Sequence, residues 1–207
     1  MNITKKEVCT DKPTVTKIIE AAIPLFATKG LANVSVKELA DAAGVNIALI
    51  SYYFGGKDNL YAYILEDQLT KLKDAIETIK VEDIPAIMRM KKFADSILAT
   101  NKNNPYICQF FHMEVFNPSK YFDTSVRNAV CHTHGFLRSC IEEAKNKGEI
   151  RGDVDAALAA MGFLKILNLS FTAHDLCKEL MGNKEDLAAQ YVAQALEIYL
   201  HGVAVQV

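Results

Sequence analysis

A short stretch of the chain, residues 46–57, carries side chains whose types and spacing suit contacts with DNA. Tyr52 and Tyr53 can donate their hydroxyls to phosphate oxygens, and Lys57 adds a positive charge at the start of a helix. Ile47 and Ala48 offer apolar groups of the kind that pack against thymine methyls in a major groove. These residues indicate double-stranded DNA as a partner if a rigid support presents them on one face.

Such a support is predicted around residue 44, as two short helices joined by a glycine turn. Ser35 followed by Glu38 is the pattern of a capping box, in which each side chain bonds the other residue's backbone N–H. Gly44 ends this helix, because glycine readily takes the positive φ that a tight turn needs. Asn46 then caps the second helix. The pattern is typical of a helix-turn-helix, which holds its second helix outward.

The apolar residues indicate which side of the second helix is buried. Val34 and Leu39 take the positions of a hydrophobic staple around the first cap. The residues spaced to face a preceding helix are Val45, Leu49 or Ile50, and Phe54. The residues expected to stay exposed are Ile47, Ala48, Ser51 and Tyr52. Exposed apolar groups on a short helix favour a partner surface over water. The alternative is an ordinary packed helical hairpin, since each of these signals alone is common.

The preceding helix is predicted over 12–29, with Asp11 or Thr10 as its cap. Gly30 should end it in the left-handed conformation. Pro24 lacks the N–H that would bond the Glu20 carbonyl, so a kink is expected there. The apolar residues recur three and four positions apart along one face, and they are Val15, Ile18, Ile19, Ala22, Leu25 and Phe26.

Helical periodicity continues through the chain, so the predicted fold is all-α with about nine helices. Helices are expected at 57–80 and 83–102, with boundaries at 103–105 and 117–118. A long helix to about Lys147, a helix capped by Asp153 to about Met181, and a last helix over about 184–202 should follow. We expect a three-helix DNA-binding domain at 1–58 and a helical ligand-binding and dimerisation domain at 59–207.

Composition sets wider bounds on the class of protein. The chain has 207 residues and a net charge of −2, and residues 1–60 hold seven lysines against six acidic residues. Pattern therefore supports DNA binding more than charge does. No apolar run is long enough for a transmembrane helix, and the start of the chain lacks the apolar run of a signal peptide, so a cytoplasmic protein is expected. Five widely spaced cysteines favour reduced thiols over a disulfide framework.

The chain resembles the TetR family of bacterial transcriptional regulators over about residues 14–63. The matching segments are AAIPLFATKG, VSVKELADAAGV, ISYYF and GGKDNLY, in that order and spacing. The resemblance implies a homodimer on a pseudo-palindromic DNA operator, and a C-terminal ligand pocket. It also implies release of the DNA when a small molecule binds, with repression as the usual mode.

The resemblance also assigns roles within the helix-turn-helix. The recognition helix falls on 46–53, and the phosphate-contacting tyrosine and lysine fall on Tyr52 and Lys57. Ser51 stands where a tyrosine is frequent, and Tyr53 stands where the family has a histidine. Weak direct hydrogen-bond readout is therefore expected, with more use of methyl contacts and DNA shape. The predicted DNA contacts are Ser35, Lys37, Val45, Asn46, Ile47, Ala48, Ser51, Tyr52, Tyr53 and Lys57.

The C-terminal body is rich in soft and aromatic side chains, which suit an apolar pocket for a small molecule whose identity the sequence leaves open. For any single residue, packing in the core is the competing interpretation. The residues predicted to line the pocket are Met88, Tyr106, Phe110, Phe111, His112, Met113, Phe136, Met161, Phe163, Phe171 and His174. Cys108 with His112, and Cys131 with His134, have spacings that permit metal ligation. Neither pair belongs to a strict motif, so no metal and no cofactor are predicted.

Apolar stripes near the C-terminus could form the interface of a homodimer through the last two helices. They are Ala156, Ala157, Ala160, Met161 and Leu164, then Leu187, Tyr191, Ala195, Leu196, Tyr199 and Leu200. Packing within one chain is the alternative. No sequence-local catalytic motif is present, so an enzyme is not expected. The predicted function is a ligand-responsive transcriptional regulator, with a helical dimerisation module or an enzyme without DNA binding as the alternatives.

Overall fold

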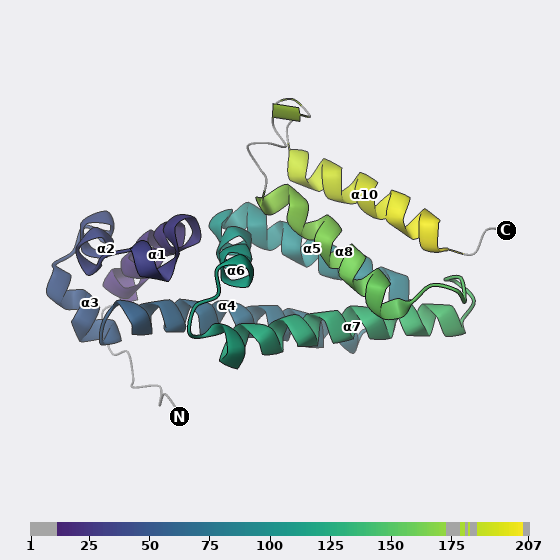
Figure 1. Ribbon diagram of the computed structural model, residues 1–207, viewed down its shortest axis with the longest axis horizontal. Coiled ribbons are helices and arrows are strands. Elements are labelled where there is room, and N and C mark those ends of the chain that lie inside the picture. The colour runs from purple at the N-terminus through teal and green to yellow at the C-terminus, as the bar shows by residue number, and fades with distance from the viewer. Residues whose placement is uncertain (1–11, 173–178, 181, 183–185, 205–207) are drawn as a thin grey trace.

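The computed structural model describes residues 12–172, 179–180, 182 and 186–204, which fold into helices (Figure 1). The elements are α1 (Lys12–Asn33), α2 (Val36–Ala43), α3 (Ile47–Phe54), α4 (Lys57–Lys80), α5 (Ala86–Asn103), α6 (Tyr106–Phe116), η1 (Phe122–Val126), α7 (Arg127–Asn146), α8 (Ala156–Thr172) and α10 (Leu187–Val203). An isolated antiparallel β-bridge pairs Ile150 with Ala204. The predicted all-α class is confirmed.

The long helix α4 runs between two groups of helices (Figure 1). Helices α1, α2 and α3 gather at its N-terminal end, and we call this group the head. Helices α5, α7, α8 and α10 surround its other end, and we call these the body. Helix α6 lies between the groups and contacts α1 on one side and α5 and α8 on the other. Both α4 and α6 therefore connect the head to the body.

Each group has its own hydrophobic core. The head core joins side chains of α1–α3 to Leu60, Tyr61, Ile64 and Leu65 of α4, and it also includes Ile107 and Phe110 of α6 and Val126 of η1. The body core includes Ile76 and Ile79 from the far end of α4, together with Phe93, Phe136 and Phe163. The head core thus continues past residue 58, and the division of the chain at 58/59 stays a prediction.

The predicted helix at 57–80 matches α4 at both ends, whereas α1 differs from its prediction. Gly30 has φ 73° and ψ 165°, which ends the first part of α1 as expected, and a short helical continuation reaches Asn33. Pro24 lies inside α1, and the residue of α1 whose φ and ψ are not helical is Gly30, so the kink at Pro24 stays a prediction. The predicted caps Asp11 and Thr10 lie outside the described residues.

The start of α8 also corrects a prediction. Asp155, not Asp153, caps this helix, because its Oδ1 accepts bonds from the backbone N–H groups of Ala157 and Leu158, each at 2.9 Å. The bond from Leu158, and then that from Ala157, lower the pKa of the Asp155 carboxyl. Asp153 instead pairs with Arg151 at 3.2 Å. Asp153 and Asp155 are two positions apart, and only the Asp155 side chain is placed to bond the N–H groups of the first turn of α8.

No helix within the described residues is both long and apolar enough to span a lipid bilayer.

Candidate nucleic-acid interface

Side-chain caps and two left-handed glycines fix the geometry of α2 and α3. The Ser35 hydroxyl accepts a bond from the Glu38 backbone N–H at 3.1 Å, and Asn46 Oδ1 accepts one from the Ala48 N–H at 2.9 Å. Gly44 (φ 64°) and Gly55 (φ 72°) end the two helices. The predicted caps Ser35 and Asn46 are confirmed. The turn between the helices is therefore short and defined on both sides, which is what a rigid recognition unit requires.

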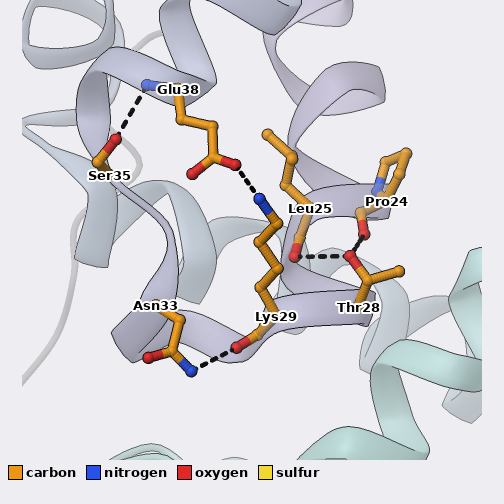
Figure 2. Close-up of polar contacts among 7 residues, drawn as sticks. All are labelled: Pro24, Leu25, Thr28, Lys29, Asn33, Ser35 and Glu38. Atoms are coloured by element: carbon orange, nitrogen blue, oxygen red, sulfur yellow. Dashed lines mark hydrogen bonds and ion pairs between the residues drawn. The ribbon is translucent and has the colours of Figure 1, made fainter.

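The second half of the predicted capping box is replaced by an ion pair. The Glu38 carboxylate accepts from the ammonium of Lys29 in α1, as Figure 2 shows, while the Ser35 hydroxyl bonds the Glu38 backbone. This bond from Lys29 is the main reason that the pKa of Glu38 is lowered. The contact ties α1 to α2 across the turn at 31–35. The sequence pattern missed it because Lys29 is nine positions from Glu38.

Helix α3 buries one side and exposes the other as predicted. Ile50 and Phe54 are buried in the head core, and Val45 and Leu49 pack against it. Ile47 is 49% exposed and Tyr52 is 77% exposed, although both are large and apolar over most of their surface. Ala48 and Ser51 are exposed beside them. An outward face of this composition on a capped helix is suited to contact with base edges.

The two tyrosines of α3 lie differently. Their rings meet edge to face with centroids 5.0 Å apart. Tyr53 is half-buried against the head core, whereas Tyr52 projects into solvent. The ring of Tyr53 therefore supports that of Tyr52, and the Tyr52 hydroxyl is the freer of the two to reach a phosphate. Lys37 and Ser35 are exposed on α2 and its cap, and Val45 is half-buried in the turn.

Lys57 has a structural role that its sequence position did not indicate. Its ammonium donates to the backbone carbonyls of Leu31 at 2.8 Å and Val34 at 2.7 Å. These carbonyls lie in the segment that joins α1 to α2, so Lys57 fastens the first turn of α4 to the helix-turn-helix. An ammonium has three N–H donors. The phosphate contact stays a prediction, and it would use the donor that remains.

The segment that follows α6 contacts the first turns of α4. Lys120 forms an ion pair with Asp58 at 2.5 Å, and the Tyr121 hydroxyl donates to the Asp58 carbonyl at 3.1 Å. One turn further on, the Tyr61 hydroxyl donates to the Glu114 carboxylate, which also accepts from the Ser119 hydroxyl at 3.1 Å. We call these contacts between residues 58–61 and 114–121 the clasp.

One part of the clasp is buried and places a carboxylate in the interior, whereas the Lys120–Asp58 pair is exposed. Tyr61 and Glu114 are each only 1% exposed. Burial first, and then the bond to Glu114, raises the pKa of Tyr61. The partners are separated by 53 to 63 positions, so no local pattern could have predicted them. The clasp joins the part of α4 that holds the helix-turn-helix to the end of α6.

The residues predicted to line a ligand pocket do not converge on one cavity. Phe110 is buried in the head core with Phe111 packed beside it, whereas Phe136 and Phe163 are buried in the body core. Met88, Tyr106 and Met161 are exposed, and His112 is half-buried. Met113 lines a separate groove at the clasp. The side chain of Phe171 and all of His174 lie outside what the structure describes. Core packing, the competing interpretation, holds for the four phenylalanines.

The cysteine and histidine pairs have ordinary structural environments. Among the described residues, no group of three or more potential ligands is placed to hold a metal. His112 stacks on Phe116 with ring centroids 4.3 Å apart, and burial and then Lys165 lower its pKa. Burial raises the pKa of the Cys108 thiol to about 12. His134 bonds the Ala157 carbonyl through Nε2 at 3.0 Å.

The predicted interface stripes of α8 and α10 are mostly used within the chain. Ala156, Ala160, Leu196 and Leu200 are buried, and the Tyr199 hydroxyl donates to the Ala159 carbonyl at 2.7 Å. Packing within one chain, the alternative interpretation, is therefore correct for them. The outer faces of the two helices carry exposed large apolar residues, of which Met161 belongs to the predicted stripes. These are Leu158, Met161, Leu169 and Ile198, exposed by 74%, 45%, 48% and 70%.

Comparison with known proteins supports this architecture. Residues 18–64 match the family described as bacterial regulatory proteins, tetR family. The chain is 33% identical over 135 residues to the probable HTH-type transcriptional regulator YttP of Bacillus subtilis. That match covers 64% of this chain and 65% of the relative. The HTH-type regulator BetI 2 of Chromohalobacter salexigens is 40% identical over 60 residues, 29% of each chain. The chain thus spans less than two thirds of the length of these relatives.

Solved structures share the whole fold at low sequence identity. The ketosteroid regulator KstR2 of Mycobacterium tuberculosis superposes with a TM-score of 0.79 at 16% identity, over 95% of this chain and 98% of that chain. FadR of Bacillus subtilis, solved in complex with stearoyl-CoA, has a TM-score of 0.67 at 20% identity, over 91% and 98%. The agreement with these solved structures covers both the head and the body.

Proposed function

Residues 18–64 form a domain of the tetR family of bacterial regulatory proteins, and from this premise we propose that the protein is a ligand-responsive, DNA-binding transcriptional regulator. It acts as a repressor that leaves its operator when a small molecule binds. The observation that carries the proposal is the outward face of α3. Two buried residues anchor this capped helix, and its exposed side offers Ile47, Ala48, Ser51 and Tyr52.

The proposed contacts divide by chemistry. Ile47 and Ala48 pack against thymine methyls, and Ser51 bonds a base edge. Tyr52 and Tyr53 contact phosphates that fix the register on the duplex. Lys57, Ser35 and Lys37 flank the helix on its two sides and serve phosphates as well, with Asn46 and Val45 at the turn. The base contacts of Ile47, Ala48 and Ser51 distinguish few base pairs, so the sequence specificity depends also on DNA shape.

A homodimer supplies a second head, and with it a second copy of α3. One short recognition helix covers too few base pairs, and paired heads meet two half-sites of a pseudo-palindrome. We propose that α8 and α10 form the dimer interface through their exposed apolar faces. Leu158 and Ile198 are large aliphatic residues with about three quarters of their surface exposed, and such residues on neighbouring helices indicate a partner surface. The interface is isologous, with the same helix pair on both sides.

Helix α4 carries the signal between ligand and DNA. Its N-terminal half belongs to the head core and its C-terminal half to the body core. The clasp holds its first turns against the end of α6 and the segment after it, and Lys57 holds them on the helix-turn-helix. A ligand that favours one arrangement of these contacts shifts the spacing of the two heads, provided that it binds that arrangement more tightly.

Selection of binding sites from random duplex DNA tests the proposal. We expect a two-fold symmetric site bound by one dimer, and affinity that falls as salt rises. Tyr52→Phe should weaken binding to the selected site by about threefold to tenfold, the value of one hydrogen bond. Tyr106→Phe, in an exposed tyrosine of α6, is the matched control and should leave affinity unchanged. Failure to enrich any sequence, with no binding even at low salt, would refute DNA regulation.

Ile47→Ala tests direct readout separately. It should relax the preference for thymine at one position of each half-site, because the alanine is too short to reach the methyl group. An unchanged site for this variant would show that α3 does not read the sequence through Ile47. The overall affinity in low salt should change little, since phosphate contacts supply most of the nonspecific binding.

A further inference from the structure

A groove of about 880 Å³ lies at the joint between head and body. Three segments line it: residues 29–33 at the end of α1, the first turns of α4, and residues 113–120 at the end of α6 and beyond. The volume is within the range of small-molecule sites. Tyr61 and Glu114 of the clasp form part of the lining. An occupant of this groove would therefore touch the contacts that hold α4 to α6.

Glu114 is the unusual group in this groove. Its side chain is buried, and its two oxygens accept one bond each from the hydroxyls of Tyr61 and Ser119. No ion pair joins it to a lysine or arginine of the described residues. A buried carboxylate is costly unless a cation or strong donors accompany it. Two neutral hydroxyls leave Glu114 suited to accept a cationic donor from a ligand.

The cations that line the groove have other partners. Lys29 is paired with Glu38 of α2, and Lys120 is paired with Asp58. Lys57 directs its ammonium to two backbone carbonyls at the α1–α2 junction. The positive charges at the rim are therefore held by the protein's own acceptors. A bound anion would have to break these contacts, whereas a bound cation would meet a carboxylate without a charged partner.

Apolar groups complete the lining. The Phe116 ring is 59% exposed, and Met113 and Leu31 lie in the same groove. A ring or a short alkyl chain can pack there, and the face of Phe116 also attracts a cation. The lining thus combines one buried carboxylate with an apolar surface, which matches a small molecule that has an ammonium head and an apolar tail.

We propose that the groove binds a small primary-ammonium ligand, whose N–H groups donate to the Glu114 carboxylate while its apolar part packs against Phe116 and Met113. The ammonium replaces the hydroxyl of Ser119, which is half-buried, and competes with that of Tyr61. Loss of these bonds loosens residues 117–121 from α4. The inference rests on the proposed function only in assigning this loosening to the control of DNA affinity.

Calorimetric titration of the full-length, DNA-free protein with hexylammonium chloride tests the site. We expect saturable binding of one ligand per chain and a rise in the melting temperature, because the ligand binds the folded state. Hexyltrimethylammonium has no N–H to donate and should bind at least about tenfold more weakly. Hexanoate at the same ionic strength should not compete. Equal binding of the primary and quaternary ions, or no binding of either, overturns the proposal.

Two variants locate the binding. Glu114→Gln removes the charge with little change of shape and should lower the affinity for hexylammonium by about tenfold or more. Glu66→Gln, in an exposed carboxylate of α4 outside the groove lining, is the matched control and should bind as the wild type does. If Glu114→Gln does not fold, Ala32→Trp places a large ring in the groove and should abolish binding without altering Glu114. Unchanged affinity in the folded variants places the site elsewhere and refutes the proposal.

DNA binding is measured in a separate arm. Hexylammonium should lower the affinity of the wild type for its selected operator by at least about tenfold, with no such effect in the groove variant that folds. Wild-type protein that binds the amine but no DNA refutes the proposed function and leaves the site standing. Protein that binds its operator but no amine refutes the site and leaves the function standing.

Discussion

Removing one hydroxyl from the clasp should destabilise the protein by a defined amount. Tyr61→Phe keeps the ring, which contacts Phe26 and Phe110 with centroids 4.9 and 5.1 Å away, and deletes the donor to Glu114. Hydrogen bonds to charged groups contribute about 1.5–3 kcal/mol. We expect the free energy of unfolding to fall by about that amount, and the melting temperature by about 3–12 °C for a chain of this size.

Tyr199→Phe is the matched control. Its hydroxyl also donates from a helix and is partly buried, but the acceptor is the neutral Ala159 carbonyl. A neutral hydrogen bond contributes about 0.5–1.5 kcal/mol. Urea unfolding at fixed protein concentration measures both variants, and the concentration is held constant because the stability of the proposed dimer would depend on it. In a Glu114→Gln background, the cost of Tyr61→Phe should drop towards that of the control, since the acceptor is then uncharged.

The same pair of residues gives a dependence on pH with a definite sign. A tyrosine whose pKa is raised on folding stabilises the protein at every pH below its ordinary value of about 10. That stability is lost as the pH rises above 10, because the unfolded chain then ionises first. Burial raises the pKa of Tyr199 to about 12, and the pKa of Tyr61 is raised as well. Between pH 10 and 12 the wild type should lose more stability than either phenylalanine variant.

One result would refute this reasoning. If Tyr61→Phe costs the same as Tyr199→Phe within about 0.5 kcal/mol, the bond to Glu114 has no more than neutral strength. The clasp would then add little to the joint beyond apolar packing. If Tyr61→Phe loses much stability but keeps a normal affinity for the operator, the role of the clasp in stability is separate from any role in DNA binding. That result would show that the clasp supports the fold without setting the position of the head.

Lys57→Ala should weaken binding to all DNA sequences and lower the slope of log affinity against log salt by about one. Loss of its two carbonyl bonds should also reduce the free energy of unfolding by about 1–3 kcal/mol. An unchanged slope in salt titrations would exclude the phosphate contact. Leu158→Glu puts a charge on the exposed face of α8 and should convert the dimer to monomers in sedimentation velocity at micromolar concentration, whereas a stable dimer would move the interface elsewhere. At pH 8, Cys131 should react with a thiol reagent well before Cys108 and Cys140, as measured by peptide mapping. Burial raises the pKa of the Cys108 and Cys140 thiols to about 12 and about 11, so few of them are ionised at that pH. Equal reaction rates would contradict their burial.

The features that the sequence predicted well are those with local causes. The caps at Ser35 and Asn46, the left-handed Gly30 and the limits of α4 each depend on residues within about four positions. The exposed face of α3 was predicted from the spacing of its residues along the helix relative to Ile50, which is buried. All of these signals lie within one or two helical turns, where propensity and capping act.

The features that the sequence missed depend on contacts between distant segments. Glu38 has the spacing of a capping-box residue, yet Lys29 offers its carboxylate a charged donor, which is stronger than a neutral N–H. Composition could not tell which core a predicted pocket residue enters, and Phe110 joins the head while Phe136 joins the body. Glu114 received no role, because its partners Tyr61 and Ser119 become neighbours only through the packing of α6 on the head.

The sharing of α4 between two cores determines how a small change at the joint can affect the DNA-binding face. A helix of 24 residues is about 36 Å long at 1.5 Å per residue. If its far end is held in the body core, a tilt of about 5° moves its first turn by about 3 Å. Half-sites one turn of DNA apart require heads about 34–36 Å apart, so opposite shifts in the two subunits change that spacing by up to about 6 Å. Such a mismatch disengages α3 from one major groove. The clasp opposes this tilt because it binds residues 58–61 directly, whereas contacts further along α4 act on a shorter arm. A ligand that acts on Glu114 therefore needs to alter only a few hydrogen bonds to control the whole DNA-binding face.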